Sequence, residues 1–420
     1  MIVCKFGGTS LASGREIAAR AEVVESRRAR GCLVVASAMA RVSRELLRLA
    51  RAAESGSRGE VDELLEGLLQ RHREALSVSG ISPEEAGIEA EGRKLETALE
   101  QVLENGTLSP GEIDRILATG ELLSSRIVHA VLQSRDVPTD WIDPRDLVVT
   151  DESYGDARPD LPETARRVRD VIVPRLSPER VVVTGGFVGR SRTGNTTTLG
   201  WGASDLSASL LGAVLGAETV EIWTDVDGIA TADPKLVPTA RTLRRLSHRE
   251  AAELAYFGAE VLHHRAITPL VGTSVILQIR NSFRPEDPGT LVVPRNGETG
   301  VRGVSLTSPF LRETLPSSLS CPSQEPTEDP VWGFQGQGSR YRSGSGPRGG
   351  ARVSLLTLVG HGIHRNGSVG LEAGGILSGT GAAEGVSGPC DAHLAFVLPG
   401  VRAETALRRV HDAFCGEDRP

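Results

Sequence analysis

Short apolar runs alternate with longer amphipathic stretches over the first 295 residues of the chain. Ile2–Phe6, apolar except for Lys5, and Cys32–Ala36 are short and rich in aliphatic residues, and both predict buried strands. A glycine-containing turn and the helical stretch Glu16–Arg28 lie between them. Strand, helix and strand in about 35 residues predict a βαβ unit, and hence a parallel sheet covered by helices.

The same alternation continues along the chain and predicts further elements. The further strands are expected at Thr139–Ile142, Arg180–Thr184, Thr219–Trp223 and Ser274–Ile279. Helix starts are indicated at Ser82, Ser109 and Ser247, each followed three residues later by a glutamate. The predicted fold class is therefore α/β, with one three-layer α/β/α domain and a mainly parallel sheet over residues 1–295.

The pattern breaks between residues 316 and 350, where 19 of the 35 positions are Pro, Ser or Gly. Such a segment buries too little apolar surface to offset its ordering entropy, so it predicts a flexible linker. Beyond it, Arg352–Val359 and His393–Leu398 predict strands and Glu404–Phe414 predicts a helix. The expected division is one large α/β domain over 1–295, a linker region over 296–350, and a small α+β module over 351–420.

Charge and composition exclude several classes of protein. The 47 Lys and Arg residues against 54 Asp and Glu give a net charge of −7, so no basic excess exists for binding nucleic acid. No run of 18 apolar residues is present, and no membrane partner is expected. The first residues predict a strand and not a signal peptide, and five scattered cysteines form neither a disulfide framework nor a zinc spacing. A cytoplasmic location is therefore expected.

Lysine is rare in this chain, which makes each lysine informative. Only Lys5, Lys94 and Lys235 are lysines, and the other basic residues are arginines. A retained ammonium suggests a role that needs a compact point charge. Chance survival is the alternative, and it is the preferred interpretation for Lys94, which lies in a charged helical stretch.

Three segments carry candidate chemistry. Lys5-Phe6-Gly7-Gly8-Thr9-Ser10 follows a strand, and its glycines let backbone N–H groups approach an anion, although an ordinary tight turn has the same appearance. Gly194–Asp205 places three threonine hydroxyls before the helix Ser207–Leu215, which favours phosphate or carboxylate binding; Ser204 and Asp205 could alternatively be helix caps. Trp223–Ile229, with Lys235 shortly after, ends a strand where open α/β sheets bind ligands, although it could be a plain polar turn.

Taken together, these segments resemble the aspartokinase family of the amino acid kinase superfamily, from Met1 to about Leu291. The other motifs that carry the resemblance are Ser37-Ala38-Met39, Gly120-Glu121, Thr184–Gly189, Phe257-Gly258-Ala259, Val261-Leu262-His263 and Asn281–Leu291. The resemblance implies an amino acid kinase fold followed by ACT-like, ferredoxin-like modules. The tail departs from that pattern, so a degenerate ACT-like region without ordinary lysine or threonine feedback is expected.

The resemblance also implies an activity, ATP-dependent phosphorylation of L-aspartate to 4-phospho-L-aspartate, the first step towards lysine, threonine and methionine. By that resemblance Lys5 and Asp205 are catalytic, and Mg²⁺ is held mainly by the ATP phosphates rather than by protein ligands. The expected ATP-binding residues are Gly7, Gly8, Thr224, Asp225 and Lys235, and the expected substrate-binding residues are Ser43, Glu121 and Ser204. A homo-oligomer is expected.

Several positions depart from the family pattern, most of them on the substrate side. Trp201 stands where the family has an arginine that grips a substrate carboxylate, and Glu260 stands where many relatives have a lysine on the phosphate side. Arg41 replaces a usual glycine. Two alternatives to aspartate kinase therefore remain open: a kinase of the same fold acting on another small carboxylate, and a catalytically silent regulatory paralogue.

Overall fold

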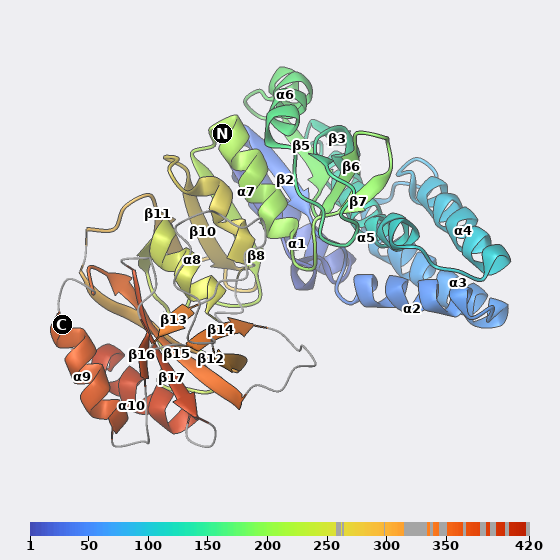
Figure 1. Cartoon of the computed structure of the whole chain (residues 1–420). Helices are drawn as coiled ribbons and strands as arrows, with labels where there is room; N and C mark the ends of the chain where they lie inside the picture. The colour runs from blue at the N-terminus through green and yellow to red at the C-terminus, as the bar shows by residue number, and fades with distance from the viewer. Residues whose placement is uncertain are drawn as a thin grey trace. The chain divides into compact units, whose positions relative to one another are not determined.

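The chain divides into two units in a computed structural model, which we describe one at a time (Figure 1). The first unit comprises residues 1–227 and 265–294, and the second comprises 228–264 and 295–420. The structure describes residues 1–257, 262, 264–297, 299–314, 334–336, 339–343, 351–363, 367–378, 384–386, 392–399 and 403–416.

The first unit contains a mainly parallel sheet, as predicted. Its strands lie in the order β3-β5-β2-β1-β8-β10-β11, and only β11 runs antiparallel to its neighbour. The strands are β1 (Ile2–Phe6), β2 (Cys32–Ala36), β3 (Thr139–Ile142), β5 (Val181–Gly185), β8 (Thr219–Thr224), β10 (Ile276–Asn281) and β11 (Thr290–Val293). The central strands are buried along their length because helices cover both faces, which explains their nearly continuous apolar sequence.

Helices pack on the two faces of this sheet and at one end of the unit (Figure 1). They are α1 (Gly14–Glu25), α2 (Val42–Glu54), α3 (Arg58–Leu76), α4 (Ile88–Asn105), α5 (Pro110–Gln133), α6 (Leu161–Ile172) and α7 (Ser204–Leu215). The helix α7 lies along β1 and β8, α1 packs with α5, and α2, α3 and α4 contact one another. A small separate sheet is formed by β4 (Val149–Thr150), β6 (Val188–Ser191) and β7 (Thr196–Thr198).

Two of the three helix starts predicted from the sequence are confirmed, and the third is wrong. Ser109 and Ser247 form complete capping boxes with Glu112 and Glu250. Ser82 and Glu85 also exchange hydrogen bonds, at 3.2 and 3.3 Å, but only a turn follows. Gly87 adopts φ +75°, which interrupts the helical path, so α4 begins only at Ile88.

The second unit is built on an antiparallel sheet with strand order β13-β14-β12-β15-β17-β16. The strands are β12 (Gly300–Thr314), β13 (Phe334–Gly336), β14 (Ser339–Ser343), β15 (Ala351–His361), β16 (Glu384–Val386) and β17 (His393–Pro399). Its helices are α8 (His248–Tyr256), α9 (Gly367–Ser378) and α10 (Ala403–Cys415), and a short strand β9 (Arg245–Ser247) precedes α8.

Alternation along β15 builds two apolar cores in this unit. Leu356 and Leu358 pack with Leu407 of α10, whereas Leu355 packs with Phe257, which follows α8. The strands β13 and β14 fall inside the stretch predicted as a linker, and the rest of 316–350 lies outside the described residues. The border at residue 295 is also a border between units, but 228–264 group with the second unit. The assignment of the tail to ACT-like modules stays a prediction.

Candidate active site

The carboxyl ends of the parallel strands meet at one edge of the first unit's sheet. Phe6 at the end of β1 lies in register with Ala36 of β2 and Trp223 of β8. The turns that follow these strands therefore begin side by side, at the edge where open α/β sheets bind ligands. The sequence-predicted residues Gly7 and Asp225 lie in these turns.

Lys5 and Asp205 form an ion pair at this edge. Lys5 projects toward α7, and its Nζ lies 2.5 Å from Oδ1 of Asp205 in the first turn of that helix. Both residues are more than nine-tenths buried. The N-cap of α7 is Ala203, and no side chain caps the helix, so the alternative interpretation of Ser204 and Asp205 as capping residues is wrong.

Glu121 lies beside this pair, on α5. It is 4% exposed, and the Ser204 hydroxyl donates a hydrogen bond to its Oε1 at 3.5 Å. Its Oε2 has no hydrogen-bond partner within the described part of the chain. Burial raises the pKa of Glu121 to about 8, and the backbone N–H groups of Ala38 and Glu121, the Lys5 charge and the Ser204 hydroxyl only partly oppose that rise. The buried carboxyl is therefore able to receive a further positively charged or hydrogen-bonding group.

Glycines allow the surrounding segments to converge on the cluster. A Cβ on Gly186 would lie 2.8 Å from Cβ of Ser204, and one on Gly120 would lie 2.8 Å from Cβ of Ala38. A Cβ on Gly8 would lie 2.9 Å from the Ala38 carbonyl oxygen. Side chains at these three positions would push apart the turn after β1, the loop after β2, and the helices α5 and α7.

The glycine turn after β1 differs from the expectation in one respect. The Gly7 N–H donates to the Trp223 carbonyl at 3.0 Å, so it is not free to bind an anion in this conformation. A Cβ on Gly7 would lie 3.6 Å from Lys5 Nζ, which places this glycine directly beside the lysine. Gly8 precedes the short 3₁₀ helix η1 (Thr9–Leu11).

The threonine-rich segment also differs from its expected form. Thr197 shares a hydrogen bond with Thr150 at 2.6 Å between hydroxyl oxygens, and the Thr198 N–H and hydroxyl both donate to Asp114 at 2.8 Å. These hydroxyls hold β7 in its small sheet and do not form an open loop before α7. Asp114 was not predicted, because its partner lies 84 residues away and no local pattern links the two.

The remaining predicted residues differ in how exposed they are. Ser43 is half-buried in the first turn of α2. The Thr224 hydroxyl donates to the neighbouring Asp225 at 3.3 Å, and Asp225 is exposed. Lys235 belongs to the second unit and is exposed there, with its backbone N–H bonded to Asp233 at 2.9 Å. Glu260 lies outside the described residues.

Trp201 occupies a turn between two glycines with positive φ and is 55% exposed. An arginine from a distant segment, Arg265, lies near this turn. It donates to the Leu199 carbonyl at 3.4 Å and pairs with Asp156. Arg41 keeps the left-handed backbone, at φ +69°, that the expected glycine would favour.

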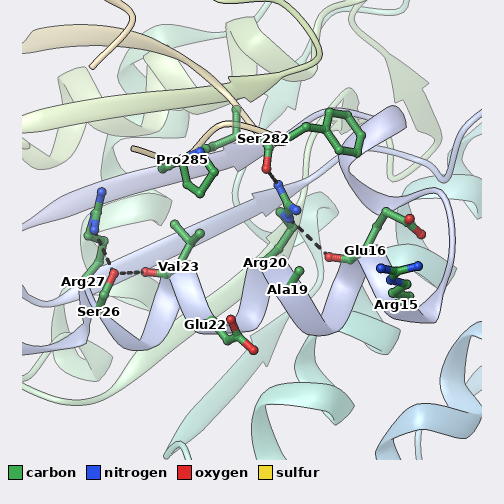
Figure 2. Close-up of a pocket in the computed structure, with 12 residues that line it drawn as sticks. Arg15, Glu16, Ala19, Arg20, Glu22, Val23, Ser26, Arg27, Ser282 and Pro285 are labelled. Atoms are coloured by element: carbon green, nitrogen blue, oxygen red, sulfur yellow. Dashed lines mark hydrogen bonds between the residues drawn. The ribbon is translucent and has the colours of Figure 1, made fainter. Parts of the chain in front are cut away.

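A cavity of about 660 Å³ lies away from the predicted residues, between α1 and residues 282–285 (Figure 2). Arg15, Arg20, Arg27 and Phe283 are among the residues that line it. The described residues include no cluster of three or more His, Cys, Asp or Glu able to hold a metal ion. Among them there is also no helix of the length and apolarity needed to cross a membrane.

Comparisons with known proteins agree with the geometry. The sequence model of the amino acid kinase family matches residues 1–281. Lysine-sensitive aspartokinase 3 of Escherichia coli is 36% identical over 301 residues, which cover 70% of this chain and 64% of that protein. A bifunctional aspartokinase/homoserine dehydrogenase 2 of Arabidopsis thaliana is 34% identical over 295 residues, 69% of this chain and 32% of that protein. The chain thus spans less than two thirds of the first relative and about a third of the second.

A solved structure extends the likeness beyond the first unit. Aspartokinase III of E. coli, in complex with aspartate and ADP, matches 98% of this chain and 99% of its own, with a TM-score of 0.84 and 28% identity. The α/β fold class and the resemblance drawn from the sequence motifs are both confirmed. The chain belongs to the amino acid kinase superfamily and, within it, to the aspartokinase family.

Proposed function

We propose that this protein transfers the γ-phosphoryl group of ATP to the side-chain carboxylate of L-aspartate, giving ADP and 4-phospho-L-aspartate. The observation that carries the proposal is the buried cluster of Lys5, Asp205, Ser204 and Glu121 at the carboxyl edge of the sheet. The similar E. coli aspartokinase III was solved with aspartate and ADP, which supports the same pair of ligands here.

The reaction brings two anions together, so the site must reduce their repulsion and align them. An aspartate carboxylate oxygen attacks the γ-phosphorus, the bond from the γ-phosphorus to the bridging oxygen breaks, and ADP leaves with that electron pair. Lys5 would neutralise the phosphoryl group in transfer, and its pairing with Asp205 holds the ammonium in one place. Gly7 and Gly8 would let the phosphates lie close to the backbone beside it.

Glu121 and Ser204 would hold the acceptor. The substrate's ammonium would occupy the unused side of the Glu121 carboxyl, and this pairing would shift Glu121 back to its ionised form. Ser43 would lie at the substrate, and Thr224 and Asp225 along the nucleotide. The nucleotide role of Lys235, which belongs to the second unit, stays a prediction from the sequence. Mg²⁺ would be held chiefly by the nucleotide phosphates and would reduce their charge when bound.

A second candidate is a kinase of the same fold acting on another small carboxylate. The exposed Trp201 favours it, because an indole cannot supply the bidentate cationic contact that an arginine gives a carboxylate. Trp201→Arg separates the candidates: with aspartate as the true substrate and a missing contact, kcat/KM should rise by about 10- to 100-fold. No gain, together with a loss in Arg265→Ala, would show that Arg265 has taken over the contact.

The direct test is trapping of acyl phosphate with hydroxylamine, using ATP, Mg²⁺ and a panel of carboxylic amino acids. Hydroxamate formed with aspartate supports the first candidate, and hydroxamate formed only with another acid supports the second. Folded protein that gives no hydroxamate with any acid would instead favour a catalytically silent regulatory paralogue. A cytoplasmic location and a homo-oligomeric state remain predictions that fractionation and sedimentation would check.

A further inference from the structure

The glycine turn beside Lys5 is tied to the ends of two other strands through Ser10. Ser10 is fully buried in η1, its hydroxyl lies 3.2 Å from the Trp223 carbonyl oxygen, and Ser282 Oγ lies 2.5 Å away. The same Trp223 carbonyl accepts the Gly7 N–H at 3.0 Å. The carbonyl that ends β8 therefore anchors the turn at two points, before and after Gly8.

The hydrogen bonds fix a direction for the two hydroxyl protons. Ser10 has one proton, and the Trp223 carbonyl can only accept, so Ser10 donates to Trp223 and Ser282 donates to Ser10. Ser282 itself is held by its own backbone N–H, which donates to the Thr224 carbonyl at 2.7 Å. Ser282, which directly follows β10, is thereby bonded both to β8 and to the turn after β1.

Arg20 completes this arrangement from α1. Its guanidinium Nη1 donates to the Ser282 carbonyl, and its Nε donates to the Glu16 carbonyl at 3.3 Å, as Figure 2 shows. Arg20 is 7% exposed, and no carboxylate in the described part of the chain forms an ion pair with it. A cation buried against backbone carbonyls is costly to desolvate, which indicates that its hydrogen bonds serve a purpose beyond packing.

We propose that Arg20, Ser282 and Ser10 form a brace that holds the Gly7–Gly8 turn in the position required beside Lys5. The three act as positioning residues and not as catalytic residues, because none of them is placed against the reacting atoms. The inference rests on the proposed function for its kinetic consequence, but the brace itself is a property of the turn that can be measured without turnover.

The cavity beside Arg20 allows the brace to be tested by chemical rescue with a small guanidinium compound. Arg20 lines the 660 Å³ cavity, so Arg20→Ala leaves a space that is continuous with it and large enough for a small guanidinium compound. The matched control is Arg15→Ala, which removes an exposed arginine that lines the same cavity but forms no hydrogen bond to Ser282. Ser26→Ala is the control for a lost serine hydroxyl. Ser26 also lines the cavity, and within the described part of the chain its hydroxyl bonds only the Val23 carbonyl and Arg27.

Amide hydrogen exchange over residues 7–11 tests the brace directly. We expect faster exchange in Arg20→Ala, Ser282→Ala and Ser10→Ala than in the parent, and parent-like exchange in the two controls. For turnover, kcat should fall by about 10-fold in each brace variant while KM values change by less than about 3-fold. Ser10→Ala combined with Ser282→Ala should cost no more than either change alone, because the two hydroxyls act as one chain. Added ethylguanidinium should restore kcat in Arg20→Ala and leave Ser282→Ala unchanged.

Unchanged exchange over residues 7–11 in all three brace variants would overturn the inference, whatever their activity. So would additive losses in the double variant, or an activity loss that follows only the fraction of unfolded protein and is not restored by ethylguanidinium. A parent that forms no acyl phosphate would remove the proposed function, and hydrogen exchange would then still decide whether the brace exists.

Discussion

Two buried glutamates in the first unit, Glu121 and Glu221, show how the same side chain is used for different purposes. Both Glu221 oxygens are engaged: Oε1 lies 3.3 Å from Arg27 and 3.8 Å from Arg280, and Oε2 accepts the Trp223 indole N–H at 2.9 Å. Arg280 also lies over the Trp223 ring, 4.7 Å from its centroid. Glu121, in contrast, leaves Oε2 without a hydrogen-bond partner in the described residues.

The difference separates a structural cluster from a candidate site. A buried carboxylate whose two oxygens are both paired with guanidinium and indole groups has no unused oxygen for a ligand. A buried carboxyl with an unused oxygen and a pKa of about 8 is costly to ionise until a ligand arrives. Lys5 of the candidate site and Cys4, whose thiol donates to Glu221 at 3.7 Å, are neighbours on β1, and alternate residues of a strand face opposite sides of the sheet.

The largest expected effect is on turnover, from Lys5→Ala. Loss of one transition-state charge partner should lower kcat by about 10²–10³, while ATP binding changes much less, because the charge matters most to the phosphoryl group in transfer. ADP release and nucleotide titration measure the two quantities. Lys94→Ala is the control, since that lysine is largely exposed on α4 and, among the described residues, pairs with Glu91 alone. Equal kcat in Lys5→Ala and parent would show that Lys5 is a structural residue.

The second effect is on stability, from Glu221→Gln. Removing the carboxylate leaves the half-buried guanidinium groups of Arg27 and Arg280 without their counter-charge, which should lower the free energy of unfolding by about 1.5–3 kcal/mol. Thermal unfolding checks this, and KM for the acceptor should stay near the parent value in protein that remains folded. A large rise in KM without loss of stability would mean that Glu221 also takes part in binding the acceptor and is not purely structural.

The third effect is on acceptor binding, from Glu121→Gln. Exchange of the carboxylate for an amide removes a charge-assisted contact of about 1.5–3 kcal/mol and should raise KM for aspartate by about 10- to 100-fold. The same variant assayed with an acceptor that lacks the amino group should show little change, because no ammonium is present to pair. Equal losses with both acceptors would assign Glu121 a role other than binding the amino group.

The fourth effect is the pH dependence of stability at Glu121. Its pKa is raised from 4.5 to about 8, so the folded state binds the proton more tightly than the unfolded chain does. The stability that the proton confers is fully present below pH 4.5 and is lost as pH rises towards 8. The Tm of Glu121→Gln minus that of the parent should therefore increase over this interval, by about 2–4 °C for each kcal/mol. A constant difference across the interval would contradict the raised pKa.

Much of the fold follows from local sequence alone. The strands β1, β2 and β3 have the predicted bounds, and the capping boxes at Ser109 and Ser247 form as expected. These features depend on residues within a few positions of one another, where apolar patterning and side-chain caps act directly on the backbone. The order of motifs was equally sufficient to assign the family.

Tertiary structure alone decided which polar groups are free and which are already used. Thr197 and Thr198 were candidates for a phosphate site, but Thr150 and Asp114 engage their hydroxyls. Ser10 carries no local signal that distinguishes it from Thr9, yet a partner 272 residues away ties it to the turn beside Lys5. Residue type and spacing determine what a group is able to bond, whereas the packing of distant segments determines whether a partner is present, so the sequence identified Lys5, Glu121 and Asp205 but could not reveal what holds their surroundings in place.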